Sequence, residues 1–236
     1  MTRALRLTFA FSIAAAISAP LEAQDLTVVS KISMGERSGT QTQYLTSKKS
    51  RTTDGQNDTI MEYATGRFVF IDHTKKQYWE TSMAEMAAYF DKIEGELKGN
   101  PMFDSMFGGP DAVKVERDKG SRKIAGYDCD NYTMSMGTSF VFELCAAKGL
   151  QPPPQYFEAR KFSYASMGPM GKRYAKMFEE MKKISGFPLS LAMNSDMGMM
   201  KQHILTEATE VRKGAVPDSA FEIPAGYSKK PSPFNR

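Results

Sequence analysis

The sequence predicts an α+β domain in which antiparallel strands are interrupted by two amphipathic helices. Residues 25–81 contain short β-prone runs separated by Gly, Asn and Asp, which is typical of a meander of hairpins. Two later segments, 82–97 and 171–184, instead place apolar residues at the spacing of one helix face. Strand-like runs return at 112–147 and 187–213. Runs of strands separated by isolated helices favour the α+β class.

The first strand and the first helix carry the clearest patterns. Residues 25–34 alternate so that Leu26, Val28, Ile32 and Met34 share one face of a strand. The helix over 82–97 is expected to begin at Ser82, with Glu85 three residues later completing a capping box.

The beginning of the chain has the pattern of a secretory signal peptide. Arg3 and Arg6 precede an apolar run from Leu7 to Ile17, and small residues follow up to Ala23. Such a segment is too short for a typical membrane span, although an uncleaved anchor is the alternative. No later segment is apolar enough to span a membrane. We therefore expect cleavage near Ala23 and a periplasmic or secreted protein.

The remaining chain is expected to form one domain over 24–228, followed by a disordered tail over 229–236. The whole sequence carries a mild net charge of +4 and no arginine-rich block, which argues against a nucleic-acid partner. No phosphate-binding loop, nucleophile elbow or paired-histidine metal motif is present, so we expect no cofactor. The only histidines, His73 and His203, are expected to be surface or strand residues. The sequence therefore predicts a protein that is not an enzyme.

The two cysteines are expected to form a disulfide bond. Cys129 and Cys145 lie at equal distances from Gly137, where a hairpin turn is expected. An exported chain folds in an oxidising compartment, which favours a disulfide, and two buried thiols are the alternative.

A register in which the two cysteines directly oppose each other also pairs Tyr132 with Phe142. Side chains alternate across a strand, so the disulfide would lie on the face opposite an apolar set. That set comprises Tyr132, Met134, Phe140, Phe142 and Leu144.

The stretch MNSDMGMMKQH, residues 193–203, raises the question of a copper site, because methionine thioethers suit Cu(I). Its centre, NSDMG, is rich in turn-forming residues, and it separates two strand-like runs. Met199 and Met200 would point to opposite faces of a strand, which works against a shared ligand set. We expect a hairpin here, and metal binding is the less favoured interpretation.

Three segments resemble a family of secreted bacterial proteins known only as a domain of unknown function. They are KIAGYDCDNYTM at 123–134, GFPLSLAM at 186–193 and FEIPAGYSK at 221–229. That family is similar in architecture to the outer-membrane lipoprotein carrier, the LolA-like fold. The resemblance implies a strongly curved antiparallel sheet, an incomplete barrel, with helices covering its concave face. The carrier has a proline after an early-strand arginine, whereas no proline follows Arg51 here, and this departure puts lipoprotein delivery in doubt.

The function expected from this shape is non-covalent binding of a lipid or acyl chain between the curved sheet and the helices. Methionine packs against varied apolar partners, and several methionines lie on the two helices. The alternative is a protein-interaction or structural envelope module with a packed interior and no ligand. The residues expected to line the apolar site are Met83, Met86, Ala87, Phe90, Ile93, Tyr132, Met134, Phe140, Phe142, Leu144, Tyr174, Met177, Phe178 and Met181.

Overall fold

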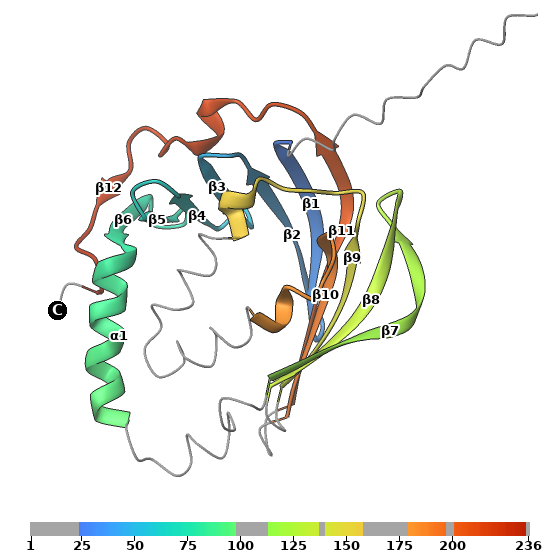
Figure 1. Cartoon of the computed structure of the whole chain (residues 1–236). Coiled ribbons are helices and arrows are strands. Elements are labelled where there is room, and N and C mark those ends of the chain that lie inside the picture. Colours follow the sequence, from blue (N-terminus) through green and yellow to red (C-terminus); the bar gives the residue numbers. More distant parts are fainter. Residues whose placement is uncertain (1–23, 98–112, 137–139, 158–178, 197–200, 235–236) are drawn as a thin grey trace, which may run out of the picture.

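The computed structural model describes residues 24–97, 113–136, 140–157, 179–196 and 201–234. Within these residues, twelve strands form one open sheet in the order β12-β6-β5-β4-β3-β2-β1-β11-β10-β9-β8-β7 (Figure 1). All pairs are antiparallel except β12, which runs parallel to β6. The strands are β1 (Leu26–Met34), β2 (Arg37–Leu45), β3 (Lys49–Thr53), β4 (Asn57–Glu62), β5 (Arg67–Asp72), β6 (Gln77–Ser82), β7 (Val113–Ile124), β8 (Tyr127–Met136), β9 (Phe140–Ala147), β10 (Phe187–Asp196), β11 (Lys201–Lys213) and β12 (Ser228–Lys229).

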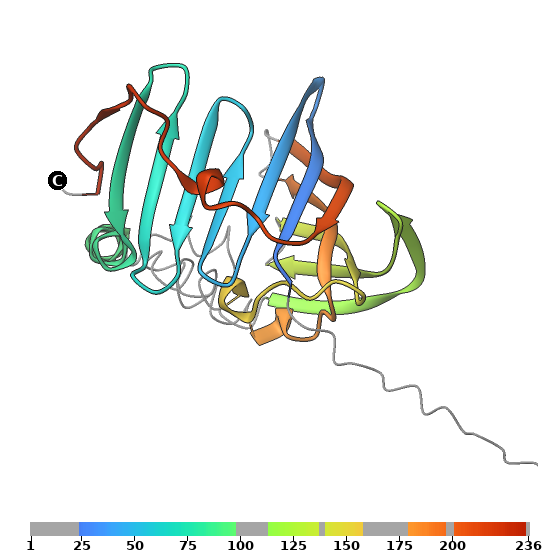
Figure 2. The same cartoon turned by 90° about the horizontal axis from the view of Figure 1, so that it is seen from above.

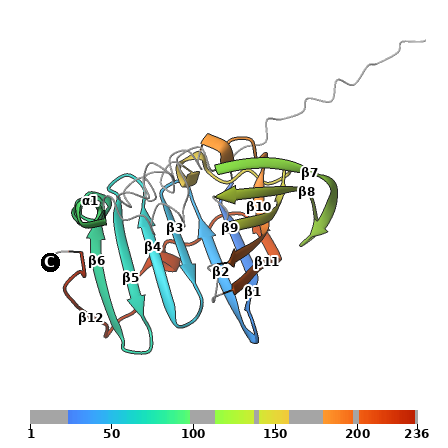
Figure 3. The same cartoon turned by 90° about the horizontal axis from the view of Figure 1, so that it is seen from below.

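The predicted fold, an antiparallel sheet whose concave face is covered by helices, is wrong. The sheet is mixed, and helix α1 (Met83–Leu97) follows directly from β6 at one side of it, as Figure 3 shows. The other described helical residues are single turns at 154–157 and 179–181 and the 3-10 turn η2 (Asp218–Phe221). An apolar stripe shows that a helix packs against something, but it does not show which surface that is.

The start of α1 agrees with the prediction. The Glu85 amide donates a hydrogen bond to Ser82 Oγ at 3.1 Å, and the Ser82 amide donates to Glu85 Oε2 at 2.8 Å. These reciprocal bonds form a capping box, which satisfies amide groups that have no partner within the helix. Met83 packs on the turn between β4 and β5, where its side chain lies close to Gly66.

The segment between β11 and β12 covers the outer face of β3–β6. Figures 1 and 2 show it crossing these strands on the outside of the curve. Phe221, Ile223 and Tyr227 from this segment pack on Ile60 and Val69 of β4 and β5. The FEIPAGY motif therefore covers the outer face of this half of the sheet.

The turn between β7 and β8 lies within the KIAGYDC motif, residues 123–129. Its two turn residues, Ala125 and Gly126, have φ angles of 49° and 85°. Positive φ at both central positions matches a type I′ turn, whose twist suits two-residue hairpins. This tight turn places Cys129 near the start of β8.

The β8–β9 pairing confirms the predicted faces but differs in register. Tyr132 pairs with Leu144, and Asn131 pairs with Cys145, so the ladder is displaced by two residues from the one expected. The pairing is symmetric about position 138 and not about Gly137, so the predicted centre was wrong by one position. Moving the centre of a hairpin by one position moves every residue pair by two. A displacement of two preserves the face of every side chain, because the strand repeat is also two.

Cys129 and Cys145 form the expected disulfide, with a Cα–Cα distance of 5.4 Å. They are diagonal rather than directly opposed in the ladder, and they lie on the face of the hairpin opposite Tyr132 and Met134. Both cysteines are buried in a core cluster with Leu26, and other members include Val28, Leu45, Leu150, Tyr156 and Phe187.

Loss of this disulfide is expected to destabilise the protein without abolishing its fold. A bridge between residues 16 positions apart restricts the unfolded chain, which corresponds to about 3 kcal/mol in the chain-entropy model. The measurement is the melting temperature of a Cys129→Ala, Cys145→Ala double variant against the oxidised parent. Two titratable thiols in the unfolded, unreduced parent would contradict the bridge.

The methionine-rich stretch joins β10 and β11 as a hairpin, as predicted. Asp196 pairs with Lys201 and Asn194 pairs with His203. Residues 197–200, which hold three of the methionines of the alternative Cu(I) interpretation, lie outside the described part of the chain.

Candidate apolar-ligand site

A row of six apolar residues crosses six neighbouring strands on the inner face of the sheet. Each residue directly opposes the next in the register, so all six side chains point to the same side. Strands lie about 4.8 Å apart, which gives the row a length of roughly 24 Å. Along the sheet order β1-β11-β10-β9-β8-β7, the members are Met34, Ile204, Met193, Phe142, Met134 and Val115.

One end of this apolar row is covered and the other is open. Met134 and Val115 are buried in a cluster that Met181 and Ile184 pack against. The Tyr132 hydroxyl accepts a hydrogen bond from the Ser185 amide at 3.3 Å, which fixes the covering turn. At the other end, the Met34 side chain is 43% exposed.

A second row on the same face widens the open end. Leu191 pairs with Leu144 on β9 and with Thr206 on β11, and Thr206 pairs with Ile32. Leu191 is 39% exposed, whereas Leu144 is buried. Leu191 and Met34 are two of only three large apolar residues that the described chain exposes strongly.

The hairpin residues of the predicted site lie together with Met181 of the second predicted helix, whereas the described residues of α1 lie elsewhere. Tyr132, Met134, Phe140, Phe142, Leu144 and Met181 belong to one cluster. Met83 and Met86 are buried and Ala87 is half-buried on α1, which adjoins β6 near the opposite end of the sheet order. The side chains of Phe90 and Ile93, and residues 174, 177 and 178, lie outside the described part.

Sequence reasoning missed Met34, Ile32, Leu191, Met193 and Ile204 as site residues. Met34 and Ile32 were placed on one strand face, but the partner of that strand, β11, comes from the far end of the chain. Alternation within each strand shows which residues share a face, whereas only the register shows which strands are neighbours.

The inner face also carries an aromatic patch over β4–β6. The Trp79 ring stacks on Phe70 with a centroid distance of 5.3 Å, and Phe68 lies 5.8 Å from it. Met61 pairs with Phe68 on the same face. Phe234 from the C-terminal tail contacts the Trp79 ring edge-on at 5.6 Å.

Beneath the C-terminal segment, a buried polar network links β3, β4 and the turn after β5 to residues 220 and 227. Asp58 is fully buried and forms an ion pair with Arg51. His73 Nε2 lies 2.7 Å from Asp58 Oδ2, and His73 Nδ1 lies 2.7 Å from the Tyr227 hydroxyl. Arg51 also donates a hydrogen bond to the Ala220 carbonyl at 2.6 Å. The contacts of Arg51 with Ala220 and of His73 with Tyr227 tie the C-terminal segment to the sheet, so His73 has a structural role here.

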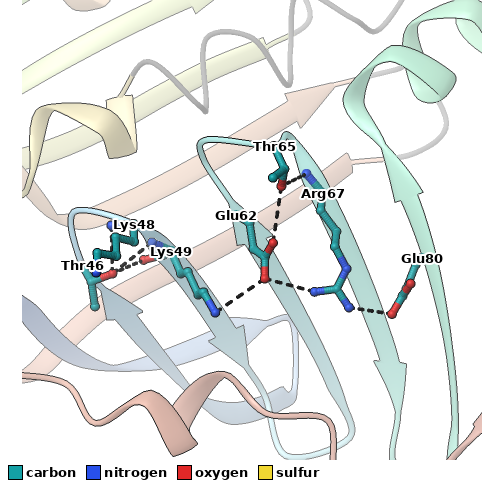
Figure 4. A network of polar contacts seen from close by, with 7 residues as sticks. All are labelled: Thr46, Lys48, Lys49, Glu62, Thr65, Arg67 and Glu80. Carbon is teal, nitrogen blue, oxygen red and sulfur yellow. Dashed lines mark hydrogen bonds and ion pairs between the residues drawn. The ribbon is translucent and has the colours of Figure 1, made fainter.

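A ladder of alternating charges crosses the outer face from β3 to β12. Lys49 pairs with Glu62, Glu62 with Arg67, and Arg67 with Glu80, as Figure 4 shows. Lys229 of β12 completes the ladder at 2.7 Å from Glu80. Burial alone would raise the pKa of Glu80, but hydrogen bonds from Lys229 and Arg67 outweigh it and lower the pKa below its ordinary value of 4.5.

This ladder predicts a loss of stability in acid. Because the folded-state pKa of Glu80 is lowered, its contribution is present above the unfolded value of 4.5 and is lost as pH falls below it. The melting temperature of a Glu80→Gln variant should therefore depend less on pH below about 4.5 than that of the parent. Asp130, whose pKa is lowered by Lys148 and Arg117, titrates in the same direction, so the dependence is reduced rather than abolished. An equal dependence of melting temperature on pH in the parent and in Glu80→Gln would contradict this role of Glu80.

No group of three or more His, Cys, Asp or Glu side chains in the described residues is arranged to hold a metal ion. His203 is exposed, with its Nδ1 2.6 Å from Asn194 Oδ1. Within the same residues, no helix combines the length and apolar character needed to cross a membrane.

The chain matches the model of one sequence family and is similar in fold to several solved structures. The model of the family described as Domain of unknown function (DUF4412) matches residues 27–227. None of the curated proteins compared with the chain is similar to it in sequence.

Among solved structures, an uncharacterized conserved protein from Thermus thermophilus is similar at 8% identity and a TM-score of 0.50. That match covers 90% of this chain and 93% of the other. A structure of PNGF-II is similar at 12% identity and a TM-score of 0.43, covering 89% of this chain but only 32% of PNGF-II. A putative outer membrane lipoprotein-sorting protein domain from Vibrio parahaemolyticus is similar at 9% identity and a TM-score of 0.24, covering 84% of this chain and 89% of that domain.

Proposed function

Because the chain belongs to the DUF4412 family, whose description assigns no function, we propose a function from its own structure: extracytoplasmic, non-enzymatic binding of an apolar chain. The ligand class is a lipid or acyl chain lying along the apolar row from Met34 to Phe142. The observation that carries this proposal is the row itself, which runs from a packed core to an exposed end.

The shape and composition of the row support an elongated apolar ligand. Soluble proteins rarely expose large contiguous apolar surfaces, and those that do use them for binding. The open part is made of flexible Met34 and Met193 and branched Ile204, with Leu191 of the second row beside them, and such side chains can adapt to chains of different shape. Charged residues are absent from this row, so nothing in it would select for a charged group.

The compartment is supported by the disulfide and by the predicted signal peptide. A disulfide between Cys129 and Cys145 persists where the environment is oxidising, as in the bacterial periplasm or outside the cell. Lipids and acyl chains released in such a compartment need a protein surface to shield them from water.

The test is binding of a fluorescent fatty acid to the delipidated protein, comparing two variants. Leu191→Gln places an amide in the second row, beside the open end of the apolar row, and is expected to weaken binding about fivefold, which corresponds to the loss of roughly 1 kcal/mol of apolar contact. His203→Gln is the matched control, because His203 is exposed on the opposite face of β11 and should leave binding unchanged. No saturable binding by the parent would overturn the proposal and favour a protein-interaction module.

A further inference from the structure

The C-terminal tail occupies a site formed by β6 and α1. Phe234 lies between two aromatic rings, 5.6 Å from Trp79 of β6 and 5.3 Å from Tyr89 of α1, and meets both edge-on. The Trp79 ring is itself held by Phe68 and Phe70, so this side of the ring contact is built by the sheet and does not depend on the tail.

The rest of the tail docks through its backbone and one charge. The Ser228 amide donates to the Lys76 carbonyl at 3.0 Å, and the Lys230 amide donates to the Tyr78 carbonyl at 2.7 Å. Lys229 pairs with Glu80, which Arg67 orients from the other side. Main-chain pairing at a sheet edge together with a side-chain pocket is the mode in which proteins recognise extended peptides.

The docked tail and the segment before it are held by separate sets of contacts. Upstream, Phe221 is buried and Tyr227 contacts His73, so that part is a component of the core. Downstream, β12 pairs with only Gln77 and Tyr78, and the Lys229 side chain is 57% exposed. The tail can therefore leave without removing Phe221 or Tyr227, and its departure would open both the strand edge and the Trp79 ring.

We propose that the tail-docking site, formed by the edge of β6 with Glu80, Trp79 and Tyr89, binds extended peptide segments of partner proteins. The tail of this chain, Ser228–Phe234, is its resident and exchangeable occupant. The preferred partner segment carries a basic residue to face Glu80 and an aromatic residue five positions later, as Lys229 and Phe234 do. Charge favours such a partner, because the tail residues Lys229 and Lys230 are both basic and the site presents a carboxylate.

The test uses Trp79 as its own reporter, since the sequence contains a single tryptophan. A variant truncated after Tyr227 is titrated with a synthetic peptide of residues 226–236, and binding is followed by Trp79 fluorescence. We expect saturable binding to the truncated chain and at least tenfold weaker binding to the full chain, whose own tail competes. Peptides carrying Phe234→Ala or Lys229→Glu should lose most of this binding.

Two results would overturn the proposal. One is a truncated chain with native circular dichroism that binds no peptide, and the other is equal binding to the truncated and full chains. If truncation prevents folding, full-length Phe234→Ala replaces it, because it empties the pocket and keeps β12. That variant should shift Trp79 emission to the red and bind the peptide more tightly than the parent, and unchanged emission and affinity would refute the site. These readouts do not involve the apolar row, so they are independent of fatty-acid binding.

Discussion

Gly186→Ala is expected to lower the free energy of unfolding by on the order of 3 kcal/mol, because two costs combine. Gly186 has a φ angle of +102°, which residues with a side chain rarely adopt. A Cβ there would also overlap the Ala147 carbonyl and lie 2.7 Å from the Lys148 amide nitrogen. The backbone of the GFPLSLAM motif passes this closely because Phe187 pairs with Ala147 at the end of β9.

The control for this prediction is Gly126→Ala in the β7–β8 turn. Gly126 also has a positive φ, +85°, but no atom lies within 4 Å of the added Cβ. It therefore reports the conformational cost alone, expected to be roughly 1–2 kcal/mol. Chemical denaturation of both variants separates the two terms, and equal losses would show that close approach at Gly186 is not important.

Asp58→Ala is expected to destabilise the protein by about 3–5 kcal/mol, since it leaves Arg51 buried beneath the C-terminal segment without its counter-charge. The Asp58 side chain is fully buried and the Arg51 side chain is only 15% exposed. One carboxylate oxygen of Asp58 has no hydrogen-bond partner among the described residues, so the network already includes a desolvation cost.

Glu62→Ala is the matched control, because Glu62 lies on the same face of β4 but its ion pairs with Lys49 and Arg67 are partly solvated. Pairs of this kind contribute about 0–1 kcal/mol. Equilibrium unfolding should therefore separate the two variants by at least about 2 kcal/mol. A loss at Asp58 no larger than at Glu62 would contradict the structural importance of the buried network.

The features that the sequence predicted correctly depend on local periodicity. The faces of the β8–β9 hairpin were correct despite a register error of two, because alternation determines the face whatever the exact pairing. The capping box at Ser82 and Glu85 was correct because its partners are three residues apart. The predicted membership of a domain-of-unknown-function family is confirmed by a match that spans most of the chain.

The features that were missed depend on contacts between distant parts of the chain. Arg51 and Ala220 are 169 residues apart, and no periodic pattern reports that the C-terminal segment crosses β3–β6. Phe234, in the tail expected to be disordered from residue 229, contacts the rings of Trp79 and Tyr89, which lie far from it in the sequence. One signal was available: Asp58 shares a strand face with the core residue Ile60, and a carboxylate in such a position needs a buried partner.

The path of the C-terminal segment also limits how early the chain can fold. β1 pairs with β11, and the core over β4 and β5 is completed by Phe221 and Ile223. The N-terminal hairpins therefore have no cover for their outer face until the last residues of the chain are available. Contacts of such high sequence separation slow folding, because a long loop must close before they form. With this topology, the sheet and its outer cover are completed only when strands from the two halves of the chain meet, so the slowest contacts are expected to be those of β1 with β11 and of β4 and β5 with Phe221.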